Sequence, residues 1–179
     1  MAQLPYLTYG QVPPMSSQEF KKLAQSLISK SDASLLDYLS LMPDYSDKIA
    51  AKCGFLKKWR DWEFSLRLGL AKQRAIKLKQ DVPLEEPKTS YMDAAAVILK
   101  AIDEGSPLKG EIMLDKARWY AIEEITGSNY FHRDCAFAYF LKLLLLERRQ
   151  SFDVDKGFDE YKSLYASIVD SVHNEGDLK

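Results

Sequence analysis

Four consecutive leucines, Leu143 to Leu146, lie within the segment AYFLKLLLLERRQSFD (residues 138–153) and constrain the fold more than any other feature. On a helix, the apolar side chains of this segment cover nearly the whole circumference, and only Lys142 interrupts them. The run is shorter than the roughly 20 apolar residues that cross a bilayer, and charged residues end it. We therefore expect the central helix of a bundle or, alternatively, a helix that docks in a groove of another subunit.

The rest of the chain has helical rather than strand periodicity. Ser16 and Glu19 have the spacing of a capping box, in which two side chains satisfy backbone N–H groups at a helix start. Period-two alternation of β-branched residues is nearly absent. We predict an all-α, multi-helix bundle with helices at about residues 16–28, 32–42, 46–80, 90–105, 107–127, 130–151 and 158–173.

Prolines divide the chain into an arm and two helical regions. Residues 1–15 contain three prolines, which exclude a helix, so we expect an extended arm there. The segment DVPLEEPKTS, residues 81–90, is the clearest linker. We expect residues 16–80 to form an N-terminal helical lobe that contains a long basic helix, and residues 91–179 to form a C-terminal helical lobe. Alternatively, the two regions form one domain.

Composition narrows the class of protein. The net charge of −1 argues against an overall electrostatic field that would attract nucleic acid or anionic lipid. The two cysteines are too few for a disulfide framework. The simplest interpretation is that they are reduced thiols in a cytosolic protein. The N-terminus has neither the basic opening nor the apolar stretch of a secretory signal. We expect a cytoplasmic protein that is not inserted in a membrane.

The long helix predicted for residues 46–80 is strongly basic. Arg60, Arg67 and Arg74 recur every seven residues, so they share one side of the helix with a slow drift. One interpretation is a cationic stripe that binds an acidic partner helix or a phosphate backbone. The other is a solvated face, which is the usual role of a run of charges.

No arrangement of residues typical of catalysis or metal binding is evident in the sequence. His132 and Cys135 are three residues apart, but a zinc site needs four ligands, or three and a water. The adjacent carboxylates Glu123 and Glu124 diverge by about 100° on a helix and do not converge on one atom. We expect no enzyme activity, no metal and no cofactor.

The tryptophans allow three interpretations. Trp59 and Trp62 lie on one face of the predicted long helix, where two tryptophans are more often core than an interface anchor. A small-molecule pocket bordered by these two residues and Trp119 is the third possibility, and it requires an enclosed, mostly apolar cavity.

Two stretches of the chain resemble a known family. They are YGQVPPMSSQEFKKLAQSLISKSDASLLDYLSL (residues 9–41) and FHRDCAFAYFLKLLLLERRQSFDVDKGFDEYKSLYASIV (residues 131–169). Both resemble uncharacterised bacterial proteins encoded alongside the components of rotary V-type ATPases. The N-terminus departs from that pattern, because LPYLTYG is shorter and more broken than the strand-like opening of family members.

The resemblance implies a stand-in for the stalk-seating subunit, the all-helical part that seats the central stalk on the membrane rotor of a V/A-type ATPase. Its partners would be stalk or rotor proteins, and it would lie at the cytoplasmic face of the membrane without entering it. For this role we expect docking through Arg60, Arg67 and Arg74, with Tyr6, Tyr9 and Val12 of the arm as a second contact. The alternative function is a stand-alone helical adaptor or regulator that binds a protein or nucleic acid through the basic helix, although we expect no nucleic-acid partner.

Overall fold

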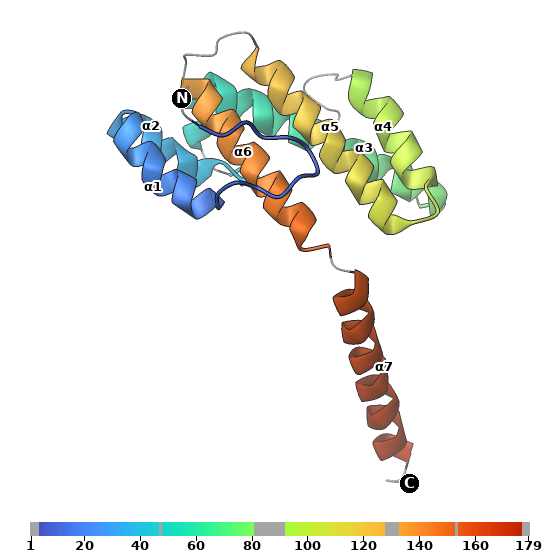
Figure 1. Ribbon diagram of the computed structural model, residues 1–179. Coiled ribbons are helices and arrows are strands. Elements are labelled where there is room, and N and C mark those ends of the chain that lie inside the picture. Colours follow the sequence, from blue (N-terminus) through green and yellow to red (C-terminus); the bar gives the residue numbers. More distant parts are fainter. Residues whose placement is uncertain (1–3, 47, 81–91, 128–132, 153, 177–179) are drawn as a thin grey trace. The chain divides into compact units, whose positions relative to one another are not determined.

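Figure 1 shows the computed structural model of the protein, which is all-helical as predicted. The structure describes residues 4–46, 48–80, 92–127, 133–152 and 154–176, and no strand occurs among them. The helices are α1 (Ser17–Leu27), α2 (Lys30–Leu35), α3 (Gly54–Lys77), α4 (Met92–Asp103), α5 (Pro107–Thr126), α6 (Arg133–Gln150) and α7 (Val154–Gly176), with short 3₁₀ helices at Leu36–Tyr38 and Lys48–Lys52. The chain divides into two compact units, residues 1–149 and residues 150–179.

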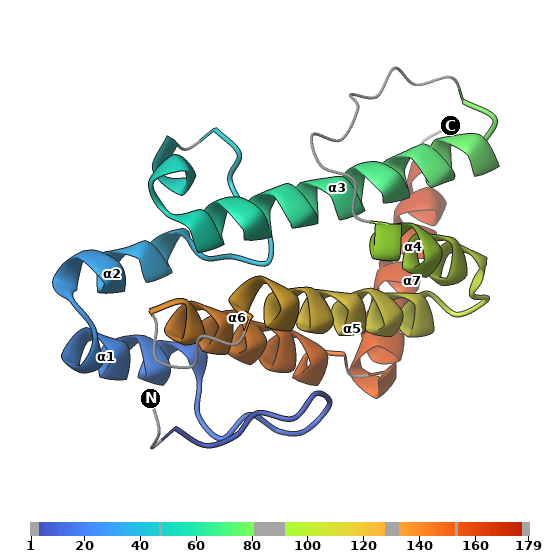
Figure 2. The ribbon, with the colours of Figure 1, turned by 90° about the horizontal axis from the view of Figure 1, so that it is seen from above.

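Within the first unit, α6 is the buried helix that the leucine run predicts. Leu141, Leu143, Leu145 and Leu146 are all at most 1% exposed, and each such burial contributes about 1.5–3 kcal/mol. Figures 1 and 2 show α6 running alongside α5. The lone Lys142 is accommodated at this contact: its ammonium group lies 2.8 Å from a carboxylate oxygen of α5 and 4.6 Å from the centroid of a tryptophan ring.

The helices that precede and follow residues 81–90 pack together in the first unit. α3 packs against both α4 and α5, and α4 packs against α5. The boundary between the compact units falls after Arg149. The predicted linker itself lies outside the described residues.

The ends of several helices differ from the predicted ones. α2 ends at Leu35 and is followed by a 3₁₀ helix to Tyr38 instead of reaching residue 42, and α7 begins at Val154 instead of residue 158. α2 is capped by Ser29, whose hydroxyl accepts a hydrogen bond from the Asp32 backbone N–H, so the helix begins before the predicted residue 32. The long helix begins at Gly54 rather than Ser46, because the chain is extended at Cys53 after a 3₁₀ helix. Its end at Lys77 is followed by Lys79, whose positive φ of 53° stops helix propagation.

The N-terminal arm is extended, as predicted, and it lies against the helices. Leu7 is buried, and the Tyr9 hydroxyl donates a hydrogen bond to the Ile112 carbonyl of α5 over 3.0 Å. From α6, the Tyr139 hydroxyl donates to the Pro5 carbonyl over 3.1 Å. The arm, blue in Figure 1, is therefore attached to α5 and α6 at two points.

None of the helices in the described ranges is long and apolar enough to cross a bilayer.

Helices α4 and α5 approach each other closely at Gly110. A Cβ atom at Gly110 would lie 2.8 Å from the backbone oxygen of Ala101, which cannot move away by a side-chain rotation. We expect Gly110→Ala to lower the free energy of unfolding by about 1–3 kcal/mol, measured by urea denaturation. The control is Gly54→Ala, where a Cβ would meet nothing within 4 Å and no loss is expected. Equal stability of the two variants would contradict the close approach.

Candidate functional site

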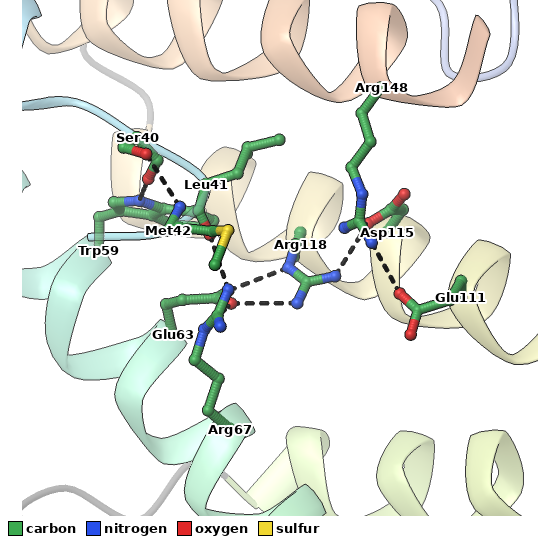
Figure 3. A network of polar contacts seen from close by, with 10 residues as sticks. All are labelled: Ser40, Leu41, Met42, Trp59, Glu63, Arg67, Glu111, Asp115, Arg118 and Arg148. Carbon is green, nitrogen blue, oxygen red and sulfur yellow. Dashed lines mark hydrogen bonds and ion pairs between the residues drawn. The ribbon is translucent and has the colours of Figure 1, made fainter. Parts of the chain in front are cut away.

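A buried ion pair joins α3 to α5 in the centre of the first unit (Figure 3). Glu63 of α3 is fully buried, and Arg118 of α5 is 4% exposed. The Arg118 guanidinium donates two hydrogen bonds to Glu63, from Nε to Oε2 and from Nη2 to Oε1, each over 3.0 Å. Arg67 donates to the same carboxylate over 2.8 Å and to the Leu41 carbonyl over 3.0 Å. Parallel pairing of this kind is among the strongest polar contacts that proteins form.

The network continues from α5 to α6. Arg118 Nη1 and Arg148 Nη1 both donate to Asp115 Oδ1 over 2.8 Å. Arg148 Nη2 donates to Glu111 Oε2 over 2.8 Å. Glu111, Asp115 and Arg118 are spaced by four and three residues, which places them on one face of α5. Ion pairs therefore connect three helices, and two of the acidic groups and one guanidinium are buried.

Burial and charge act against each other on these groups. Burial raises the pKa of Asp115 above its usual range, and the guanidinium groups of Arg148 and Arg118 only partly offset the rise. Burial by itself would lower the pKa of Arg118, but the hydrogen bonds and charges of Glu63 and Asp115 outweigh it and raise the pKa. Arg118 thus keeps its charge, and the arrangement is a structural clamp that holds a permanent cation between two carboxylates.

Three successive charged residues at the end of α6 anchor three different segments. Glu147 accepts hydrogen bonds from the Ser17 backbone N–H over 2.6 Å and from its hydroxyl over 2.7 Å, at the start of α1. Arg148 binds α5, as described above. The Arg149 guanidinium lies 5.4 Å from the ring centroid of Tyr9 in the arm. The charged group that ends the leucine run therefore fixes the positions of the surrounding elements.

The three arginines predicted as a docking stripe do not form one exposed surface. Arg60 is buried at 5% exposure, and Arg67 is bound to Glu63 and Leu41. Arg74 is exposed. The three arginines are not exposed together, because other segments of the fold cover the N-terminal half of α3. Residues spaced by seven along this helix therefore pass from the core to the surface. Partner binding by these residues remains a prediction, and the adaptor hypothesis depends on the same stripe.

The arm residues predicted as a second contact are also divided. Tyr9 points inward, with its ring 5.6 Å from that of Trp119 in an edge-to-face arrangement. Tyr6 is 90% exposed and Val12 is 76% exposed. A partner could reach Tyr6 and Val12 directly, and their role in binding remains a prediction.

The tryptophans are core residues, as the more common interpretation predicts. Trp59 and Trp62 are 0% and 6% exposed, with stacked rings 5.8 Å apart. The structure has a cavity of about 190 Å³ between α4 and α5, smaller than usual ligand sites. None of the three tryptophans lines it; its lining residues are Val97, Lys100, Met113, Lys116, Ala117 and Tyr120.

Metal-binding geometry is not found within the described ranges, where no three His, Cys, Asp or Glu side chains are grouped to hold an ion. Cys135 lies half-buried in α6, and His132 falls outside the residues that the structure describes.

The buried network was not predicted from the sequence, although the sequence contains part of the signal for it. Glu63 and Arg67 are spaced by four, and so are Glu111 and Asp115, which indicates ion pairs or shared faces within a helix. Nothing in the sequence pairs Glu63 with Arg118, 55 residues away, because that contact depends on how α3 and α5 pack.

The network also affects a nearby phenol. Burial, together with the Glu63 carboxylate, raises the pKa of Tyr45 from its ordinary value of 10.0 to about 12. Because the pKa of Tyr45 is higher in the folded state, the contribution of this phenol to the free energy of unfolding is fully present below pH 10. It is lost as the pH rises through about 12. We expect the phenolate absorbance of the wild-type protein minus that of Tyr45→Phe to titrate near pH 12, and near pH 10 in denaturant. A midpoint near 10 in the folded protein would show that neither partial burial nor the Glu63 carboxylate shifts the pKa of this phenol.

These features define an all-helical protein whose buried charges neutralise one another across three helices. Residues 93–175 match a family described as a protein of unknown function, DUF2764. The matched part contains the whole of residues 131–169, the stretch that contributes most to the resemblance described above. Neither a curated protein nor a solved structure matches the chain.

Proposed function

We propose that the protein is a non-catalytic assembly or coupling component of a bacterial V/A-type rotary ATPase, similar to the subunit that seats the central stalk on the rotor. The observation that supports the proposal is that the buried charged groups are paired with one another. Glu63, Asp115 and Arg118 are bound to one another and to neighbouring guanidinium groups. Buried ionisable groups engaged in this way rigidify the packing of α3, α5 and α6, as a part that transmits force requires.

The identity of the complex is supported by the resemblance of residues 9–41 and 131–169. In the fold, these two stretches contact each other. Glu147 accepts hydrogen bonds from Ser17, and Arg133 is bound to Asp32 at 2.7 Å. Aromatic rings of α1 and α6 also pack, with Phe20 and Tyr139 centroids 4.8 Å apart. The first stretch and the α6 part of the second stretch thus pack against each other within the first unit.

Affinity purification of the tagged full-length protein from native membranes tests this proposal. We expect stalk or rotor-ring proteins of the ATPase to copurify at stoichiometric levels in mild detergent. Recovery of the protein without any ATPase component would refute the proposal. Recovery with nucleic acid, released steeply by salt, would favour the adaptor alternative.

The contribution of the basic helix is tested with a single substitution. Charge reversal at Arg60 or Arg67 would disturb the core, so only Arg74 reports on docking alone. If Arg74 contacts the partner, Arg74→Glu weakens recovery of the stalk proteins. The control is Lys57→Glu, at an exposed residue near the other end of α3, which does not weaken recovery. Unchanged recovery with Arg74→Glu would make Arg74 a solvated residue.

A further inference from the structure

Helix α7 exposes a set of large apolar side chains. In α7, all side chains from Gly157 to Ile168 are exposed. Five of them are apolar and are between 53% and 62% exposed, which is unusual for such residues on one helix. We refer to them as the α7 stripe: Phe158, Tyr161, Leu164, Tyr165 and Ile168.

The spacing of the α7 stripe specifies the shape of what covers it. At 100° per residue, the five side chains occupy an arc of about 120°, from Leu164 to Phe158. A two-stranded coiled coil uses a narrower seam, whereas an arc of this width is typical of a helix that packs against two others at once. The stripe therefore fits the groove between two helices.

Charge narrows the chemistry of that groove. Residues 150–179 contain seven acidic residues and three lysines, so this part of the chain is net negative. Glu160 borders the stripe on one side. On the other side, the Lys162 ammonium group lies 3.9 Å from the Asp159 carboxylate and 4.3 Å from the ring centroid of Phe158. A complementary groove has basic residues along the edge that meets Glu160.

The same charge disfavours two other occupants. Helices that lie on membranes carry lysine and arginine on their polar face, and anionic lipids would repel an acidic one. Two α7 helices from two copies of the chain would bring like net charges together. A heterologous helical partner avoids both penalties.

We infer that α7 is the docking helix of this protein and that its stripe inserts into an apolar groove between two helices of the stalk, with basic residues on the edge that meets Glu160. This inference rests on the proposed function and names the surface that performs it. An isolated amphipathic helix gains most of its stability from packing, so binding would also order α7.

The test compares two substitutions of adjacent residues in the full-length protein. Leu164→Asp places a charge in the stripe, and Ser163→Asp places the same charge on the opposite side of the helix. Binding to the purified, detached stalk-containing sector of the ATPase is measured by biolayer interferometry. We expect Leu164→Asp to weaken binding by at least about tenfold, the effect of losing one central apolar contact, and Ser163→Asp to change it by less than about twofold. Circular dichroism and tryptophan fluorescence confirm that both variants retain the folded first unit.

The outcomes separate this inference from the proposed function. If the wild-type protein binds and Leu164→Asp binds equally well, the stripe is not the docking surface, although the proposed function survives. If the wild-type protein does not bind the sector, the proposed function fails and the stalk assignment fails with it. Sedimentation of the wild-type protein as a dimer that Leu164→Asp dissociates would assign the stripe to a second copy. Cosedimentation with phosphatidylserine–phosphatidylcholine vesicles that Leu164→Asp abolishes would assign it to a membrane, and either result overturns the inference.

Discussion

Glu63→Ala is expected to lower the free energy of unfolding by about 3–5 kcal/mol, because it leaves the guanidinium group of Arg118 buried without its main counter-ion. Arg118 would lose two hydrogen bonds of 3.0 Å and keep only its contact with Asp115. Urea denaturation followed by tryptophan fluorescence measures the effect on the first unit, because all three tryptophans lie within it.

The matched control removes both charges. In Glu63→Leu combined with Arg118→Met, no buried cation is left without a counter-ion and the volume is largely kept, so we expect most of the lost stability to return. Arg67 also loses Glu63, but its side chain is 40% exposed to water and it keeps the Leu41 carbonyl. Asp115 retains Arg148 as its partner in this double variant. A loss below about 1 kcal/mol for Glu63→Ala would show that water reaches Arg118 and that the pair is not buried.

Trp59→Ala is expected to cost about 3–5 kcal/mol, as typical of the largest core side chains. Trp59 is fully buried, stacks on Trp62, and donates a hydrogen bond from its indole N–H to the Ser40 carbonyl over 2.9 Å. Truncation opens a cavity and leaves that carbonyl without its donor. Urea denaturation followed by circular dichroism gives the change in stability.

An exposed aromatic residue provides the comparison for Trp59. Tyr120 is 57% exposed, and we expect Tyr120→Ala to change the free energy of unfolding by less than about 0.5 kcal/mol. Similar losses for the two variants would mean that Trp59 does not contribute to the core as its burial indicates. Normal stability of Trp59→Ala with lost partner binding would instead place Trp59 at an interface.

Local features of the sequence predicted much of the fold because their physical causes are local. Apolar side chains surround the helix at the leucine run and leave no polar face that could be turned to water. A buried helix was therefore expected. Ser16 and Glu19 form the predicted capping box, with hydrogen bonds of 3.1 and 2.8 Å at the start of α1. The prolines of the arm exclude a helix there through the constraint on φ alone.

The candidate site could not be predicted in the same way. Arg60 and Arg74 are the same residue type on the same side of one helix, yet one is buried and the other is exposed. The two arginines differ in exposure because different segments of the chain lie over the two halves of α3. Likewise, Glu63 and Arg118 become partners only after two helices separated by 55 residues pack.

By itself, the sequence determined that this protein is helical, that α6 is buried and that the arm is extended, since side-chain periodicity and backbone restriction act over a few residues. Only the tertiary structure decided which charges became buried pairs and which arginine of α3 remained exposed. Burial depends on what other segments cover a residue, and no short stretch of sequence contains that information.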